Sequence, residues 1–226
     1  MRFLLLSAAC AAIPSIASAA IVSYTDRTSF EAALGSLTIE TFESVPAKTT
    51  LVGAPVQLNG FTLQAFSQPS ASWNFIGDKK AWVDPLYASN SRQVFGGLTN
   101  NQTMVFTFAN PVYGFGADFG AFNDKGQGQR SLFEVLGQTV LPPVVTPSVR
   151  SFFGFISDTA FTQVVLRALP LTEAFGMDNV TFGAPRASVP TAPTPPAPVP
   201  APAGLPLLAG ALGFGALLRR ITRRRA

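Results

Sequence analysis

Carboxylates are the side chains of this sequence with which a search for catalytic chemistry begins. The chain has 226 residues, of which 12 are Asp or Glu and none is His. Two carboxylates can hydrolyse a glycosidic bond when one protonates the leaving oxygen and the other acts as base or nucleophile. Glu40 and Glu43 are three residues apart on a predicted strand, so they should point to opposite faces. We therefore expect a protein without enzymatic activity, and a secreted carbohydrate-active hydrolase with paired carboxylates is the alternative.

Histidine and cysteine chemistry is excluded for the predicted folded domain. The sequence has no His, and its one Cys is Cys10, close to the N-terminus. A Ser-His-Asp triad, a Cys-His pair and zinc sites built on His or Cys are therefore ruled out. The domain also has no disulfide bond.

Aromatic and polar residues are mixed between Ser72 and Tyr87, which makes this segment the candidate for a carbohydrate site. Trp73, Trp82 and Tyr87 could stack on sugar rings while neighbouring polar side chains bond the hydroxyl groups. The alternative is that both tryptophans fill the core, as large aromatic side chains mostly do.

Residues 118–130, at the end of the predicted strand 112–119, contain acidic residues and glycines and are predicted to form a loop. Asp118, Asn123 and Asp124 carry the kind of oxygen atoms that calcium binds. The loop lacks the ligand order of an EF-hand, so it could supply only part of a site. The alternative is a solvated hairpin loop in which Asn123 and Asp124 make the turn.

Strands separated by turns must position these residues. Apolar and polar residues alternate in several segments, with Gly, Pro and Asn between them. We predict an all-β fold, an antiparallel β-sandwich with one short N-terminal helix, over residues 20–185. The predicted strands cover residues 60–66, 103–108, 112–119, 131–137, 151–156, 161–169 and 176–183, with a turn at Asn110 and Pro111.

The helix and one strand face have further features. The helix should be capped by Thr25 or Asp26 and end at Gly35.

The strand at 112–119 has bulky residues on one face and glycines, including Gly114 and Gly116, on the other. Such a face indicates the close approach of another backbone or a bend.

The N-terminus is typical of a secretory signal peptide covering residues 1–19. Arg2 supplies the positive charge, an apolar segment follows, and Ala17, Ser18 and Ala19 form a cleavage signal. We expect signal peptidase to cleave after Ala19. The alternatives are a buried helix and a lipoprotein that is cleaved before Cys10.

The C-terminus combines a proline motif, an apolar segment and an arginine cluster. Residues 186–198 predict an extended Pro-rich spacer, with an SH3-type ligand as the alternative. Residues 203–218 carry no charge and predict a transmembrane helix, shorter than the ~30 Å hydrocarbon core of a bilayer. The basic residues after it should hold the C-terminus in the cytoplasm; they are Arg219, Arg220, Arg223, Arg224 and Arg225.

This tail, residues 199–226, resembles the PEP-CTERM class of sorting signals, in its VPLPA variant. The motif residues are Val199, Pro200, Ala201, Pro202, Ala203 and Gly204, with Ala201 where the family has Glu or Leu. The resemblance implies cleavage by an exosortase, a membrane protease of Gram-negative bacteria, after transient anchoring in the inner membrane. The released protein would join the cell surface or an exopolysaccharide matrix. The alternative is an ordinary tail anchor.

The net charge of +4 does not indicate a nucleic-acid partner. Arg2 and the five tail arginines account for six of the 16 basic residues, which leaves 10 against 12 acidic ones. The predicted domain is therefore slightly acidic, so its own charge does not favour nucleic acid.

The domain itself resembles the jelly-roll ectodomains that often carry such tails. The residues concerned are the early helix at 29–35, the segment 41–44 and the closing segment 175–183. Jelly rolls often hold a structural calcium ion between their first and last strands, which implies a site that pairs Asp178 with Glu40 or Glu43. The alternative is that Asp178 accepts backbone N–H bonds at a strand bulge, since a buried carboxylate needs such partners.

Overall fold

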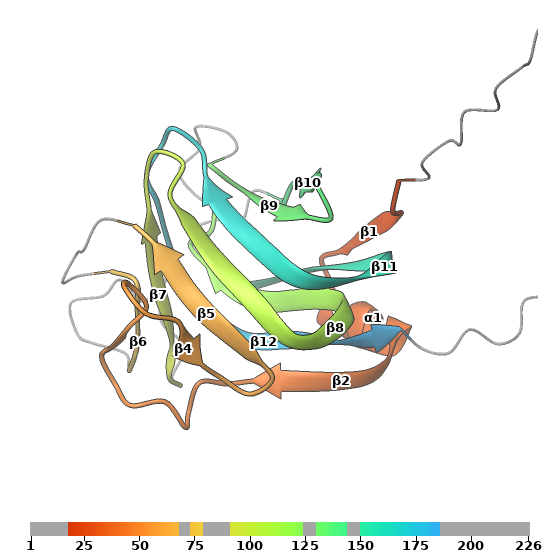
Figure 1. Cartoon of the computed structure of the whole chain (residues 1–226), viewed down its shortest axis with the longest axis horizontal. Coiled ribbons are helices and arrows are strands. Elements are labelled where there is room, and N and C mark those ends of the chain that lie inside the picture. The colour runs from red at the N-terminus through yellow and green to blue at the C-terminus, as the bar shows by residue number, and fades with distance from the viewer. Residues whose placement is uncertain (1–17, 68–72, 79–90, 124–129, 144–149, 186–226) are drawn as a thin grey trace, which may run out of the picture. The chain divides into compact units, whose positions relative to one another are not determined.

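Two long strands, β8 (Thr103–Gly120) and β11 (Ser151–Ala168), form the centre of this computed structural model. The structure describes residues 18–67, 73–78, 91–123, 130–143 and 150–185 (Figure 1). β8 and β11 pair antiparallel along both of their halves, with irregular register between Ile156 and Gln163. Both strands bend there, so each takes part in two regions of the sheet.

The described strands form one hydrogen-bonded antiparallel sheet of 12 strands that does not close into a barrel. One end of β8 pairs with β5 (Phe61–Phe66), and the other end pairs with β12 (Glu173–Pro185). The remaining strands extend from these; they are β1 (Ile21–Tyr24), β2 (Leu34–Glu40), β3 (Thr49–Thr50), β4 (Val56–Gln57), β6 (Phe75–Gly77), β7 (Gln93–Leu98), β9 (Ser131–Val135) and β10 (Gln138–Val140). The predictions of a mostly β fold and one short helix are confirmed.

Three boundary predictions were wrong. Asn110 and Pro111 do not end a strand, because β8 continues through them. Register with β11 is irregular at this bend, so the missing N–H of proline interrupts no regular pairing. The segments 151–156 and 161–169 were predicted as two strands, but they belong to one strand, β11, which also continues through its bend. Glu43 was predicted to share a strand with Glu40, but β2 ends at Glu40 and Glu43 lies in the turn that follows.

The core is made mainly of phenylalanine. Its main cluster fills the space enclosed by the bent sheet, and the side chains of Phe106, Phe115, Phe133 and Phe155 are fully buried in it. Their rings meet edge-on or tilted, as in the 4.9 Å centroid separation of Phe106 and Phe115. Such ring pairs add specific geometry to the burial of apolar area.

The helix α1 (Arg27–Ala33) begins as predicted, and its Phe30 packs against Phe152 of β11. Asp26 caps it by accepting hydrogen bonds from the backbone N–H and the hydroxyl of Ser29, at 2.8 and 2.7 Å. It ends at Ala33, and Leu34 rather than Gly35 is the C-cap.

The glycine face is occupied by large side chains beside the helix. A Cβ on Gly116 would lie 2.6 Å from the ring of Phe152, and one on Gly114 would lie 2.8 Å from Leu34. Gly154 lies directly opposite Gly116 and is covered by the same ring. The predicted close approach is therefore observed, and side chains make it as well as backbone.

The predicted leader up to residue 17, the spacer and the tail from residue 186 lie outside the described residues. Among the described residues, no helix has the length and apolar character needed to cross a membrane.

Candidate functional site

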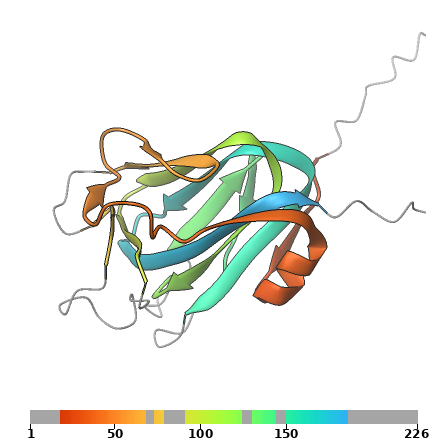
Figure 2. The ribbon, with the colours of Figure 1, turned by 90° about the horizontal axis from the view of Figure 1, so that it is seen from below.

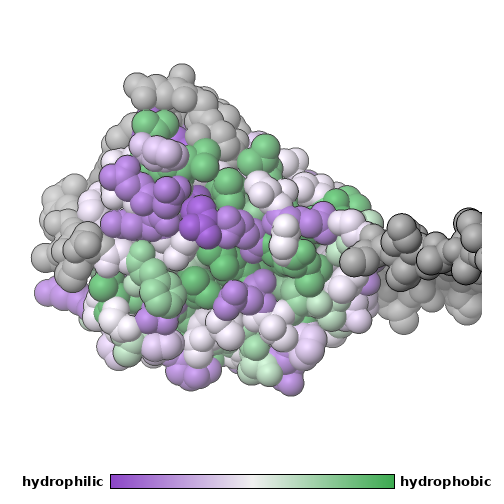
Figure 3. All heavy atoms as spheres, turned by 45° about the horizontal axis from the view of Figure 1, so that its top comes forward, coloured by the Kyte–Doolittle hydropathy of each residue, from purple (hydrophilic) through white to green (hydrophobic). Residues whose placement is uncertain are grey.

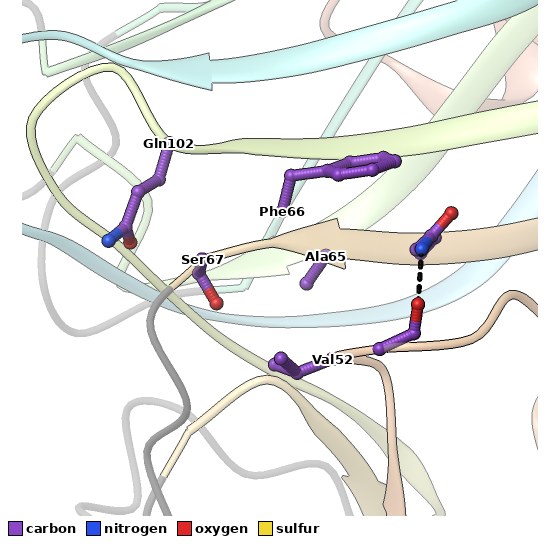
Figure 4. Close-up of a pocket in the computed structure, with 7 residues that line it drawn as sticks. Val52, Ala65, Phe66, Ser67 and Gln102 are labelled. Atoms are coloured by element: carbon purple, nitrogen blue, oxygen red, sulfur yellow. Dashed lines mark hydrogen bonds between the residues drawn. The ribbon is translucent and has the colours of Figure 1, made fainter.

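A hollow of about 440 Å³ lies at the end of β5 and is the candidate binding pocket of the described surface (Figure 4). Figure 4 shows Ala65, Phe66 and Ser67 from the end of β5, Val52 from a neighbouring segment, and Gln102 from the residues that lead into β8. We call these residues, with Gln64 and Gly53, the β5 pocket.

Strand alternation explains why an aromatic ring is exposed at this pocket. Phe61, Leu63 and Ala65 point into the core, whereas the residues between them point outward. Phe66 therefore falls on the outer face, where it is 54% exposed. It is the one aromatic residue among the large exposed hydrophobic residues of the described surface.

Two amide side chains of the β5 pocket are each held at one end. Gln64 donates from Nε2 to the carbonyl oxygen of Gly53 at 2.6 Å. Gln102 accepts at Oε1 from the backbone N–H of Thr99 at 3.1 Å. Within the described residues, Oε1 of Gln64 and Nε2 of Gln102 make no hydrogen bond. An oriented acceptor and an oriented donor thus lie in one pocket with an exposed ring.

The ion pair of Arg167 and Glu134 lies on the same outer face of the sheet. Arg167 is on β11, and β8 lies between β11 and β5. Phe66 is opposite Thr103, and Thr103 is opposite Arg167. Arg167 donates to both carboxylate oxygens of Glu134, at 2.7 and 2.8 Å. The hydrogen bond from Arg167 lowers the pKa of Glu134, and the Glu134 carboxylate raises the pKa of Arg167. The outer face therefore carries fixed, oriented charges beside the pocket.

Of the predicted carbohydrate-binding aromatics, the structure describes only Trp73; Trp82 and Tyr87 lie outside the described residues. Trp73 is half-buried and packs with Phe75 and Phe95 in a small cluster apart from the main core. The adjacent Asn74 donates to the hydroxyl of Ser67 at 2.8 Å, so the Trp73 turn is tied to the rim of the β5 pocket.

The three residues of the predicted calcium site have separate partners. Glu40 is buried and accepts from the backbone N–H groups of Phe42 and Asn59. Glu43 is exposed and accepts from the backbone N–H of Arg92. No three His, Cys, Asp or Glu side chains among the described residues gather in a way that could hold a metal ion. The structure thus does not bring Glu40, Glu43 and Asp178 together.

Asp178 instead belongs to a polar cluster at a bulge in β12, between Asp178 and Thr181. It accepts from the backbone N–H of Asn179 at 2.7 Å and from the hydroxyl of Ser91 at 2.6 Å. Arg150 lies 3.5 Å from the same carboxylate. This arrangement corresponds to the alternative in which Asp178 accepts a backbone N–H bond at a bulge.

Arg27 of α1 is the cation that joins the first elements to the last strand. Its guanidinium group lies 3.0 Å from Asp118 and 3.0 Å from Glu31. It also donates to Oγ1 of Thr181 at 2.7 Å and to the carbonyl oxygen of Asn179 at 3.1 Å. Oxygen atoms from α1, β8 and β12 thus surround a guanidinium group.

The loop after β8 is closed by a buried asparagine. Asn123 accepts at Oδ1 from the backbone N–H groups of Arg130 and Ser131, at 3.0 Å each. Asn123 therefore ties together the two ends of the loop whose middle, residues 124–129, lies outside the described residues. Asp118, the other described oxygen donor of that prediction, faces Arg27.

Sequence reasoning missed Phe66, Gln102 and Arg27. The alternation within residues 61–66 already places Phe66 on the polar face with Thr62 and Gln64, which was an available signal. Arg27 and Asp118 are 91 residues apart, and no local pattern pairs them. The sequence matches no model of a known protein family, and no curated protein is significantly similar to it.

Proposed function

We propose that this chain is an exported protein that an exosortase processes and delivers to the cell surface or extracellular matrix. The support is the sequence of its two ends: a leader with the Ala17–Ala19 cleavage signal, and a tail with the proline motif, apolar segment and arginine cluster. Its role there is structural or adhesive, without catalysis.

The finer fold that we propose is a jelly-roll-like β-sandwich. The bends of β8 and β11 support it, because each strand pairs with different neighbours before and after its bend. A sheet that folds over in this way can face itself across a phenylalanine core (Figure 2).

The binding activity that the geometry supports best is recognition of a polysaccharide. The observation that carries it is the exposed ring of Phe66 in one pocket with the side-chain amides of Gln64 and Gln102. Within the described residues, each amide uses one polar atom in a hydrogen bond and leaves the other available. Sugar rings stack on aromatic faces, and their hydroxyl groups need oriented donors and acceptors. On the face shown in Figure 3, hydrophilic side chains run in a band between hydrophobic ones, which suits a hydrated polymer.

Affinity electrophoresis tests the binding proposal. The purified chain would run in gels that contain dextran, xyloglucan, galactomannan or the polysaccharide of the producing cell. We expect at least one polymer to retard the wild-type chain and Phe66→Ala to abolish the retardation. Leu141→Ala is the matched control, because Leu141 is 59% exposed and lies beyond β10, away from the pocket. Retardation that survives Phe66→Ala would overturn the assignment to this pocket.

The same samples separate binding from hydrolysis. Release of reducing sugar that is lost on changing one carboxylate to its amide would replace the proposal by the hydrolase alternative.

Intact mass of the protein from the cell envelope and the medium tests the sorting proposal. Loss of the chain beyond the proline motif is expected. A full-length chain found only in the membrane would contradict exosortase processing and indicate a plain anchor.

A further inference from the structure

The strand β2 forms an open edge of the sheet. Within the described part of the chain it pairs with β12 alone, from Leu34 opposite Pro185 to Glu40 opposite Val180. It lies at the lower edge of the sheet in Figure 1, and in the view from below β12 runs beside it (Figure 2). Its seven residues exceed the four of β1, the three of β10 and the two each of β3 and β4.

From Ser36 to Ile39 this edge has no lysine, proline or bulge that would prevent strands from pairing between molecules; the one irregularity in its pairing lies between Leu34 and Ser36. From Leu34 to Ile39 the strand has no charged residue and no proline, and its register with β12 is regular from Ser36 to Glu40. Leu37 and Ile39 are 41% and 40% exposed. Natural edge strands usually carry lysine, proline or a bulge, because an unprotected edge is a template for another strand.

We propose that β2 is a docking surface for a second copy of this chain, with the two β2 strands antiparallel about a two-fold axis near Leu37. Residues at equal distances from the axis then lie opposite each other. Leu37 meets its own copy, and Ile39 of each copy lies next to it on the same face, which gives an apolar row. On the other face, Ser36 meets Thr38, a pair of hydroxyl side chains that can hydrogen-bond to each other.

Charge is compatible with this pairing. The only charged residue of β2 is Glu40, which would meet Leu34 of the other copy, and its carboxylate already accepts two backbone N–H bonds of its own chain. No like charges are placed opposite each other, a contact that would destabilise the pair. The interface is isologous, so it closes as a dimer and merges two sheets into one.

Cysteine cross-linking of the full chain in its membrane tests the pairing. Two variants would be oxidised and separated without reductant, beside the unchanged chain as the background from Cys10: Leu37→Cys, which meets its own copy, and the double variant Ser36→Cys/Thr38→Cys, in which each cysteine lies opposite the other position of the partner copy. We expect at least one of them to give a reducible dimer several-fold above that background. Thr107→Cys is the matched control, because Thr107 is exposed but lies on β8, which is paired on both sides.

A second change distinguishes strand pairing from chance collision. Adding Leu37→Lys to the double variant Ser36→Cys/Thr38→Cys puts like charges at the axis and should reduce the dimer to the Thr107→Cys level. The proposal fails if neither Leu37→Cys nor the double variant cross-links above that control, or if the lysine has no effect.

Discussion

Asp118 and Asp178 lie directly opposite each other on β8 and β12, and Asn179 bonds both of their carboxylates. The backbone N–H of Asn179 donates to Asp178 at 2.7 Å, and its Nδ2 donates to Asp118 at 2.8 Å. Arg27 and Arg150 supply the positive charge on either side, at 3.0 and 3.5 Å. Hydrogen bonds from Asn179 and the charges of Arg27 and Arg150 thus stabilise these two neighbouring carboxylates. Through Arg27, the same contacts connect α1 to β12.

Arg27→Met should lower the free energy of unfolding by about 2–3 kcal/mol, because a three-quarters buried cation with several oxygen partners is lost. The guanidinium carbon also lies 4.7 Å from the centroid of the Phe152 ring, so methionine removes this cation–π contact together with the polar ones but keeps an unbranched apolar side chain. Chemical denaturation of the purified chain measures the change. Glu31→Gln removes one partner only and should cost far less; equal losses in the two variants would contradict a central role for Arg27.

Asn179 should tolerate glycine better than alanine. Its backbone has a φ of 50°, a left-handed conformation that Cβ disfavours. Both substitutions lose the hydrogen bond to Asp118, worth about 1 kcal/mol, and alanine should lose about 1 kcal/mol more through strain. Thermal unfolding of the two variants side by side checks the order. If alanine proves as stable as glycine, the bulge does not require this conformation.

Local sequence patterns predicted the elements that depend on local physics. Asp26 was one of the two predicted helix caps, with Thr25, because a short polar side chain before an apolar helical face bonds the first free N–H groups. Alternation located β5 and both ends of β8 for a similar reason, since one face of each strand is buried in the core.

The lengths of strands and the long-range partners could not be predicted in the same way. A period of two continues through a bend, so the pattern could not show that Asn110 and Pro111 lie inside one strand. The contacts of Arg27 join residues 91 to 154 positions apart, and they depend on the topology of the whole sheet. The carbohydrate prediction selected tryptophans by type, whereas exposure at Phe66 follows from strand parity.

Glu134→Gln should reduce stability near neutral pH and have little effect in acid. The hydrogen bond from Arg167 lowers the pKa of Glu134 below its value in the unfolded chain. The charged form therefore stabilises the fold above the unfolded pKa, and this contribution is lost as pH falls through the folded pKa, from about pH 5 downward. The pair is about one-third exposed, so we expect less than about 1 kcal/mol.

Denaturation of the wild type, Glu134→Gln, Arg167→Gln and the double variant at pH 7 and pH 3 isolates this pair. The coupling energy between the two residues should be smaller at pH 3 than at pH 7, because protonation of Glu134 has begun to remove the charge. A coupling energy that is the same at both values would show that the carboxylate charge is not its source.

Asp158 should bind the new N-terminus if the leader is cleaved after Ala19. The backbone nitrogen of Ala20 lies 3.0 Å from Oδ1 of Asp158, and the backbone N–H of Asp158 donates to the carbonyl oxygen of Ala20 at 3.1 Å. Cleavage would turn that nitrogen into an ammonium group and the hydrogen bond into an ion pair. Asp158→Asn should then lower the melting temperature of the processed chain more at pH 6 than at pH 10, because the ammonium group has lost its proton above about pH 9.

A chain that keeps its leader through Ala19→Phe has no ammonium group at Ala20, and there the effect of Asp158→Asn should not depend on pH between these values. A pH dependence that is the same in the two chains would place the charge elsewhere and argue against a mature N-terminus at Ala20.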